Sequence, residues 1–321
     1  MSNPTQPCPV LQGGQRSWAA RYGLVIALLI LGGALAIRLP TFFTGTNLLI
    51  VARQISINGI LAVGVTFVLL TGGVDLSLGS VVALAGVVAA GFAHPGDWPL
   101  VVPVAMGLLA GTLCGAANGL LVTRGRVAPF IVTLGMMTAA RGLALVLSGG
   151  RPVSNLSPEF TAIGSASVVG IPVPVLVFSA VAALSAVFLN HFRPGRYIYA
   201  VGGNAEAARA SGINVHGVKL LSYMVCGAMA GLAGIVLAAR TTTGQPNAGV
   251  GYELDAIAAV VIGGTSLSGG VGGVKGTVLG ALLMGVISSG LDQLNVSAYY
   301  QQIIKGLIIV AAVWLDSRGK K

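Results

Sequence analysis

The sequence predicts an all-α protein that crosses a membrane many times. Hydrophobic residues make up 55% of the 321-residue chain, charged residues make up only 8%, and the mean hydropathy is +0.90. Because a soluble domain carries roughly a quarter charged residues, a soluble protein is excluded. The chain also contains 48 glycines, and glycine is more frequent in transmembrane helices than in soluble ones.

Apolar stretches divide the chain into about ten predicted membrane-spanning helices, since a span requires about 17–25 residues. They lie near residues 21–38, 48–70, 76–93, 98–122, 127–148, 173–190, 219–239, 253–268, 276–291 and 299–315. The eighth and ninth are the shortest. The first follows a Pro-rich leader without a clear cleavage site, so we expect an uncleaved span. The predicted division is a leader (1–20), a transmembrane domain (21–316) and a basic tail (317–321).

Basic residues are unevenly distributed between the two sides of the predicted membrane domain. With the N-terminus in the cytosol, twelve Lys and Arg residues fall on the cytosolic side, and only Arg38, Arg151 and Arg240 fall outside. This positive-inside pattern predicts two cytosolic termini, and it explains the net charge of +10 without nucleic-acid binding. Three further bases, Arg53, Arg141 and Lys305, fall inside apolar stretches near their outer ends. They either extend to the interface or take part in transport.

Residues 193–219 form a polar, basic segment on the predicted cytosolic side. A helix of about two turns is predicted in it, with Asn204 as N-cap, Glu206 in the first turn and Gly212 as the stop. Its small side chains would let a partner approach the backbone closely. We interpret it as a docking helix, with an ordinary solvated loop as the alternative. The candidate residues are Gly203, Asn204, Glu206, Ala207, Ala208, Arg209 and Gly212.

Two glycine-rich segments share the pattern G-G-x-x-L-S-x-G, GGVDLSLG at 72–79 and GGTSLSGG at 263–270. Each follows a predicted span at its cytosolic end, and repeated glycine breaks are typical of alternating-access transporters. Chance in a Gly-rich chain is the alternative. Asp75 is either a buried acid or, as we favour, the N-cap of the third span. The candidate pathway residues are Gly72, Gly73, Asp75, Ser77, Gly263, Gly264 and Ser268.

Catalytic and metal-binding patterns are not predicted. The three histidines are scattered, the three cysteines have no metal-ligand spacing, and neither an H-E-x-x-H pair nor a G-x-S-x-G elbow occurs. The glycine-rich run at 263–277 is not a P-loop, because Val274 precedes Lys275 where a P-loop needs glycine. We therefore expect no enzyme, no metal and no cofactor in this chain, and ATP hydrolysis would need another chain.

Four segments resemble the permease subunit of bacterial ribose-type monosaccharide ABC importers: TGGVDLSLGS (71–80), GRVAPFIVTLGMMTAARG (125–142), GRYIYAVGGNAEAARASGINV (195–215) and QPNAGVGYELDAIAAVVIGGTSLSGG (245–270). The resemblance implies a fold of the vitamin-B12-importer type (type II) in the bacterial inner membrane. It also implies a second permease copy, a double-cassette ATPase that binds ATP and Mg, and a periplasmic sugar-binding protein. The segment matching Gly203–Ile213 would be the coupling helix seated in the ATPase. By analogy, Arg38, Arg151 and Arg240 would meet acidic residues of the binding protein.

Other functions remain as alternatives. An ion-gradient-driven sugar transporter would normally carry charged residues in mid-membrane, but all eight acids map to span ends or loops. A structural membrane protein would need neither glycine breaks nor a capped cytosolic helix. Ribose is the sugar of the nearest resemblance, and permeases for allose or xylose share these motifs. Few polar side chains lie within the spans, which predicts weak binding of free sugar: Thr66, Asn118, Ser288, Ser289 and Gln293.

Overall fold

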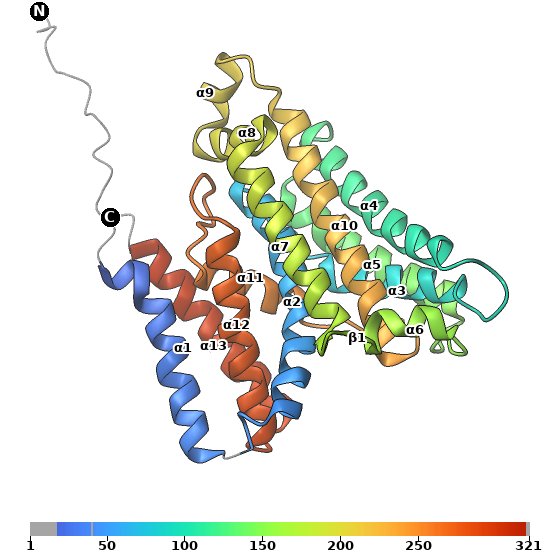
Figure 1. Ribbon diagram of the computed structural model, residues 1–321. Helices are drawn as coiled ribbons and strands as arrows, with labels where there is room; N and C mark the ends of the chain where they lie inside the picture. Colours follow the sequence, from blue (N-terminus) through green and yellow to red (C-terminus); the bar gives the residue numbers. More distant parts are fainter. Residues whose placement is uncertain (1–17, 40, 319–321) are drawn as a thin grey trace, which may run out of the picture.

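The structure is a computed structural model that describes residues 18–39 and 41–318, so most of the predicted leader and residues 319–321 of the tail lie outside the described residues. The described chain is almost entirely helical (Figure 1). The helices are α1 (Trp18–Arg38), α2 (Gly45–Leu70), α3 (Leu78–Gly91), α4 (Val101–Thr123), α5 (Pro129–Ser148), α6 (Pro158–Ser165), α7 (Val173–His191), α8 (Arg193–Gly203), α9 (Ala205–Ala210), α10 (Val215–Thr241), α11 (Tyr252–Ile262), α12 (Val274–Gln293) and α13 (Ala298–Arg318).

A helix occupies each of the ten predicted stretches, and the all-α class is confirmed. Six helices are long and apolar enough to cross a membrane, namely α2, α4, α5, α7, α10 and α12. The eighth predicted stretch, 253–268, is only partly helical, because α11 ends at Ile262, before the glycine pair at 263 and 264. The structure adds a minimal antiparallel hairpin, β1 (Ser167–Val168) paired with β2 (Ile171–Pro172).

Helix α2 forms the centre of the molecule. From Gly59 to Leu70 every residue of α2 is buried, as expected for a helix that is apolar on all sides. It packs against α10 and α7 on one side and against α11 and α12 on the other. Figure 1 shows α1, α12 and α13 grouped beside one face of α2, while α3, α4, α5, α6, α7 and α10 form the larger group beyond it.

Helices α4 and α10 pack backbone to backbone through glycines. Gly111 lies against Gly227 and Gly231, and Gly115 lies against Tyr223 and Gly227. A Cβ atom at either α4 position would collide with α10 backbone atoms. Glycines four residues apart lie on one helix face, and small residues at such spacing let membrane helices approach closely. This contact fixes α10, which carries the polar segment 193–219 at its N-terminal end.

The chain between α10 and α11 turns back into the molecule along α3. Gly244 lies against Gly86, Val87 and Ala90, whereas Gly249 lies against Gly79 near the start of α3. Because an α-helix rises 1.5 Å per residue, this re-entrant segment (242–251) descends about 12 Å along α3. Helix α11 therefore starts at the level of the start of α3, and not at the outer ends of the helices as the predicted span 253–268 implied. The starts of α3 and α11 face each other there.

Candidate functional site

The predicted docking helix exists with the predicted caps. The Asn204 Oδ1 atom accepts hydrogen bonds from the backbone N–H groups of Glu206 and Ala207, both at 3.0 Å. At the other end Gly212 has a φ of 81°, and the N–H groups of Gly212 and Ile213 donate to the carbonyls of Arg209 and Ala208, both at 3.0 Å. This geometry is a glycine C-cap. That a partner docks on α9 stays a prediction.

The faces of α9 differ in what they contact. Glu206, Ala207 and Arg209 are exposed, whereas Ala208 is only 5% exposed and belongs to the hydrophobic core. The interpretation of Ala208 as a surface contact for a partner is therefore wrong. One face of α9 packs against the rest of the protein, and the Ala208 side chain lies on that face. Gly203 is exposed, with open space where a Cβ atom would lie. The surface available to a partner consists of Glu206, Ala207, Arg209 and their exposed neighbour Ala210.

The two glycine-rich repeats meet directly beneath α8. The Gly270 N–H donates to the Leu70 carbonyl at 2.9 Å, and Gly72 lies against Ser268. Gly202, near the end of α8, packs against both Leu70 and Gly270 so closely that a Cβ atom there would overlap them. In addition, the Tyr199 hydroxyl on α8 donates to the Gly272 carbonyl at 3.1 Å. We call these contacts the glycine seat; they join the predicted docking segment to both predicted helix breaks.

Each glycine repeat ends a helix at a glycine with positive φ. Gly72 (φ 74°) follows α2, and Gly264 (φ 85°) follows α11. The neighbouring Gly73 lies against the Tyr223 side chain of α10, and Gly263 lies against Gly276 of α12. The repeats therefore produce the predicted helix breaks and also meet in space. That solute passes along them stays a prediction.

Asp75 lies in the interior beyond the first glycine pair. It is 2% exposed, and its Oδ1 atom accepts from the Ser77 N–H at 2.9 Å and from the Ser77 hydroxyl at 2.6 Å. The Asn118 amide of α4 donates to the Ser77 Oγ atom at 3.0 Å. The N-cap of α3 is Ser77, so the interpretation of Asp75 as the cap is wrong by two residues. Asp75 instead holds the turn that precedes the helix.

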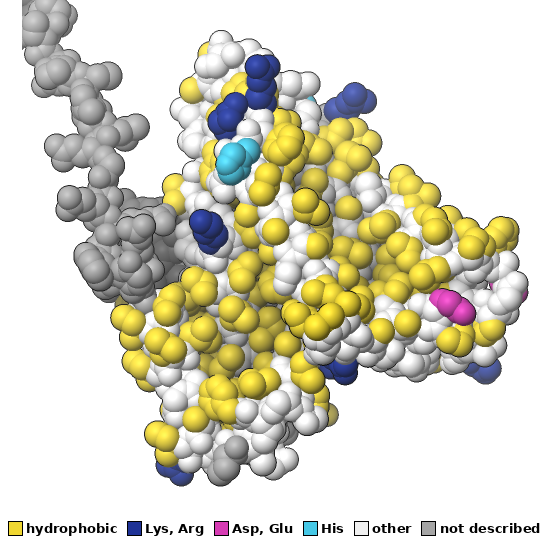
Figure 2. Space-filling view, viewed as in Figure 1, with side chains coloured by type: hydrophobic (Ala, Val, Ile, Leu, Met, Phe, Trp, Pro, Cys, Tyr) yellow, Lys and Arg dark blue, Asp and Glu magenta, His cyan; other side chains and the backbone are white. Residues whose placement is uncertain are grey.

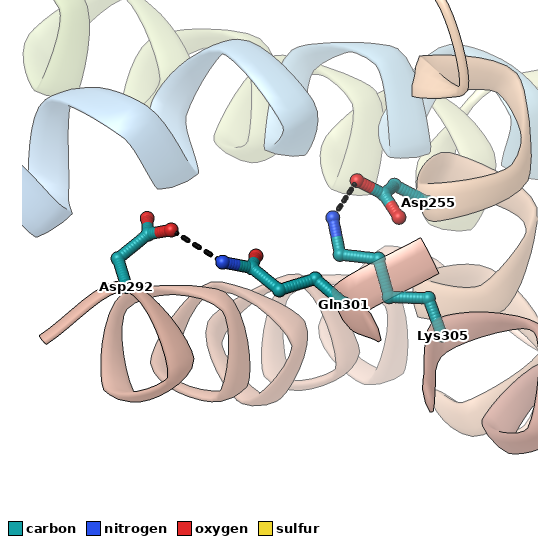
Figure 3. A network of polar contacts seen from close by, with 4 residues as sticks. All are labelled: Asp255, Asp292, Gln301 and Lys305. Atoms are coloured by element: carbon teal, nitrogen blue, oxygen red, sulfur yellow. Dashed lines mark hydrogen bonds and ion pairs between the residues drawn. The ribbon is translucent and has the colours of Figure 1, made fainter. Parts of the chain in front are cut away.

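Two basic residues inside predicted spans bind protein groups. Arg141 of α5 donates from Nη1 to the carbonyls of Pro246 and Ala248, at 2.6 and 2.7 Å, and so holds the re-entrant segment. The Lys305 Nζ atom of α13 lies 2.7 Å from Asp255 Oδ2 of α11, with side chains 22% and 11% exposed. Figure 3 shows this pair beside the Gln301–Asp292 hydrogen bond. Extension to the interface is therefore not their role.

Sequence reasoning missed these two contacts because their partners become neighbours only through the fold. It placed Asp255 at the outer end of a span, whereas the structure buries it at the inner start of α11. The third such base, Arg53, donates to the Ser165 carbonyl at 3.3 Å. The sequence did contain one signal for Asp255, the two glycines Gly249 and Gly251 before α11. In the structure both have positive φ, and the approach to the helix is irregular.

The three predicted binding-protein contacts differ in accessibility. Arg38 and Arg151 are exposed, but Arg240 is half-buried and α6 packs on its backbone through Gly164. Figure 2 shows hydrophobic side chains over the long sides of the helices and several Lys and Arg side chains at the α8–α9 end. This distribution agrees with a protein that is surrounded by lipid and carries its main basic surface at the end with the glycine seat.

Comparison with known proteins identifies the relatives of this chain. The family described as "Branched-chain amino acid transport system / permease component" matches residues 47–313. The ribose import permease protein of Escherichia coli K12 is 46% identical over 94% of this chain and 95% of the relative. The ribose import permease protein of Haemophilus influenzae is 46% identical over 91% of both chains.

A third relative, the D-allose transport system permease protein of Escherichia coli, is 41% identical over 92% of this chain and 91% of the relative. No solved structure matches the chain. The resemblance to monosaccharide permeases noted from the sequence motifs is thus confirmed over nearly the full length. The chain belongs to the family of permease components that includes those of branched-chain amino acid transport systems.

Proposed function

We propose that this protein is the membrane-spanning permease subunit of an ATP-driven importer for ribose in the bacterial inner membrane. The observation that carries the proposal is the 46% identity to a ribose import permease over 94% of the chain. The D-allose permease is more distant, at 41%. In this proposal all ten apolar helices cross or enter the membrane, the fold is of the vitamin-B12-importer type, and both termini lie in the cytosol.

The proposed complex contains two copies of this permease, a double-cassette ATPase in the cytosol that holds ATP and Mg, and a periplasmic sugar-binding protein. Helix α9 would be the contact with the ATPase. Its direct connection to α8, which rests on the glycine seat, supports this role, because a displacement of α8 and α9 acts on the end of α2 and on the loop between α11 and α12. Arg38 and Arg151 are the better candidates for binding-protein contacts, since both are exposed.

The proposed route of coupling ends at the inner starts of α3 and α11. Both helices are interrupted, and helix N-termini inside membrane transporters are typical sites of solute passage. Glu253 and Gly249 lie against Gly79 at this point, and Arg141 and Lys305 fix the surrounding chain. Because packed elements have discrete arrangements, motion of the seat would change which side of the membrane this junction faces.

The test of the proposed function is sugar uptake by the reconstituted complex. Permease, double-cassette ATPase and binding protein from the same bacterium are placed in proteoliposomes with ATP inside, and labelled ribose, allose or xylose is offered outside. We expect ribose to enter at a rate at least about tenfold above the other sugars, which corresponds to about 1.4 kcal/mol of discrimination. Preferred uptake of allose or of xylose would reassign the substrate, and uptake of none would reject the proposal.

A further inference from the structure

A cleft of about 730 Å³ lies beside α9, between the turn that joins α4 to α5 and the first turns of α10. It is separate from the glycine seat, which lies under α8. Its lining residues are Val122, Thr123, Arg126, Val127, Ala128, Pro129, Ala205, Arg209, Val215, His216 and Lys219. Residues of four helices, α4, α5, α9 and α10, and of one turn thus surround a space large enough for a sizeable polar group.

The charge of this cleft is of one sign. Arg126, Arg209 and Lys219 contribute three permanent positive charges and His216 adds an imidazole, while no Asp or Glu lines the cleft. Within residues 18–39 and 41–318, none of these four side chains forms an ion pair or a side-chain hydrogen bond. Three positive charges gathered without an acidic partner repel one another, and a bound anion would relieve that repulsion.

The backbone conformation of Arg126 supports the presence of a preformed binding site in the cleft. Arg126 has a φ of 55°, a left-handed conformation that is uncommon for residues other than glycine, Asn and Asp. The preceding residue, Gly125, could adopt such a φ without a steric cost, yet the left-handed position is filled by an arginine that lines the cleft. Strained backbone of this kind persists where surrounding structure fixes it, and it concentrates at ligand sites.

An apolar surface continues from the same edge of the cleft. Leu120 and Leu121 end α4, and Phe130 and Ile131 begin α5; all four side chains are exposed, with Ile131 63% exposed. In the orientation predicted by the basic residues, this edge lies at the cytosolic surface of the bilayer. A ligand that complements both surfaces must carry a negative charge and an apolar body side by side.

We propose that the cleft binds the phosphate headgroup of an anionic phospholipid of the cytosolic leaflet, whose acyl chains lie along the exposed side chains of α4 and α5. Basic pockets between membrane helices on the cytosolic side have the chemistry that recognises such headgroups. An acidic surface of a protein partner would match only the charge of the cleft, whereas one anionic phospholipid would contact both the basic cleft and the exposed side chains of Leu121, Phe130 and Ile131. The lipid proposal uses the proposed orientation of the chain and does not depend on its transport activity.

The test uses the full-length chain in nanodiscs with a single tryptophan as a reporter. Trp18, Trp98 and Trp314 are replaced by Phe, and Phe130→Trp places the reporter beside the cleft. Quenching by brominated phosphatidylglycerol is compared with quenching by brominated phosphatidylcholine. Because each cation near a membrane surface adds about fivefold to anionic-lipid binding, we expect phosphatidylglycerol to be preferred at least about tenfold.

Two variants and one control locate the effect. Arg126→Gln combined with Lys219→Gln should reduce the preference by about tenfold or more, since two of the cations are removed. Arg126→Lys combined with Lys219→Arg should retain most of it. Arg124→Gln is the matched control, because Arg124 is exposed on the same turn but does not line the cleft. Size-exclusion elution and thermal unfolding of each variant show that it is folded.

Three results would overturn the proposal. One is equal quenching by the two lipids in the unmodified cleft. Another is an unchanged preference in the Arg126→Gln, Lys219→Gln variant, which would place lipid contact elsewhere. The third is loss of the preference when the ATPase is bound, which would assign the cleft to an acidic protein surface. Millimolar inorganic phosphate should not compete, because the lipid is also held by its acyl chains.

Discussion

At the scale of single residues, the glycine seat gives the sharpest contrast between neighbours. A Cβ atom on Gly202 would overlap Leu70 and Gly270, whereas a Cβ atom on Gly203 would point into open space. Gly202→Ala should lower the free energy of unfolding by about 1–3 kcal/mol, because an added methyl group in a filled site forces backbone shifts. Gly203→Ala should change it by less than about 0.5 kcal/mol. Thermal unfolding in detergent measures both; equal effects would mean that the seat is not tightly packed.

The pair of Lys305 and Asp255 also acts at this scale. Because both side chains are mostly buried, at 22% and 11% exposure, removing one charge leaves the other without its partner. A double-mutant cycle of Lys305→Met and Asp255→Asn should give a coupling energy of about 0.5–3 kcal/mol. Asp292→Asn is the control, since its partner Gln301 is neutral. Additive effects of the two substitutions would show that the ion pair contributes nothing to stability.

At the scale of elements, Arg141 ties α5 to the re-entrant segment. Its two hydrogen bonds end on the carbonyls of Pro246 and Ala248, so Arg141→Met should release the segment without opening the core around α2. We expect a cysteine at exposed Asn247 to react several-fold faster with an impermeant thiol reagent in intact cells, since hydrogen bonds from a charged group contribute about 1.5–3 kcal/mol. Cys8, Cys114 and Cys226 are first replaced.

Two controls accompany that labelling. Arg53→Met removes a comparable charge that binds Ser165 instead, and it should leave labelling at position 247 unchanged. A cysteine at Arg209, on α9, should react only after the cells are made permeable. Unaltered labelling at 247 in the Arg141→Met variant would show that other contacts hold the segment, and labelling at 209 in intact cells would invert the proposed orientation.

Helix α9 separates docking from folding within two adjacent residues. Ala207 is exposed and Ala208 is 5% exposed. Ala207→Trp should leave the amount of protein in the membrane normal and abolish sugar uptake, because the bulky ring blocks close approach of a partner. Ala208→Trp should instead lower the amount of folded protein, since overpacking a filled site costs about 1–3 kcal/mol. Immunoblots of membranes and uptake assays distinguish them. Normal uptake with Ala207→Trp would remove α9 from the coupling surface.

At the scale of the whole molecule, local sequence signals predicted the helices better than the contacts between them. Apolar length located ten of the thirteen helices in the described residues, and cap residues located α9, because both signals lie within a short stretch of sequence. The glycine seat was not predictable in this way. Leu70, Gly202 and Gly270 are far apart in sequence, and only the packing of α2, α8 and the loop between α11 and α12 brings them together.

The inner start of α11 was missed for a related reason. Hydropathy cannot distinguish a chain that leaves the membrane at residues 242–251 from one that turns back along α3, since glycines and small residues serve both. The ion pair of Asp255 and Lys305 was missed for the same reason, because it depends on the depth at which α11 begins. Of the two interior acids, Asp255 is paired with Lys305, whereas Asp75 accepts hydrogen bonds from Ser77.

The most direct test concerns the energy source of transport. Proteoliposomes containing the permease alone, or the permease with its double-cassette ATPase, receive sugar-loaded binding protein outside. We expect no ATP hydrolysis and no ribose uptake with the permease alone. With the complex we expect ATP-dependent ribose uptake, and Ala207→Trp should abolish this uptake. Ribose uptake by the permease alone, driven by a proton or sodium gradient without ATP, would contradict the assignment of this chain as the conduit of an ATP-driven importer.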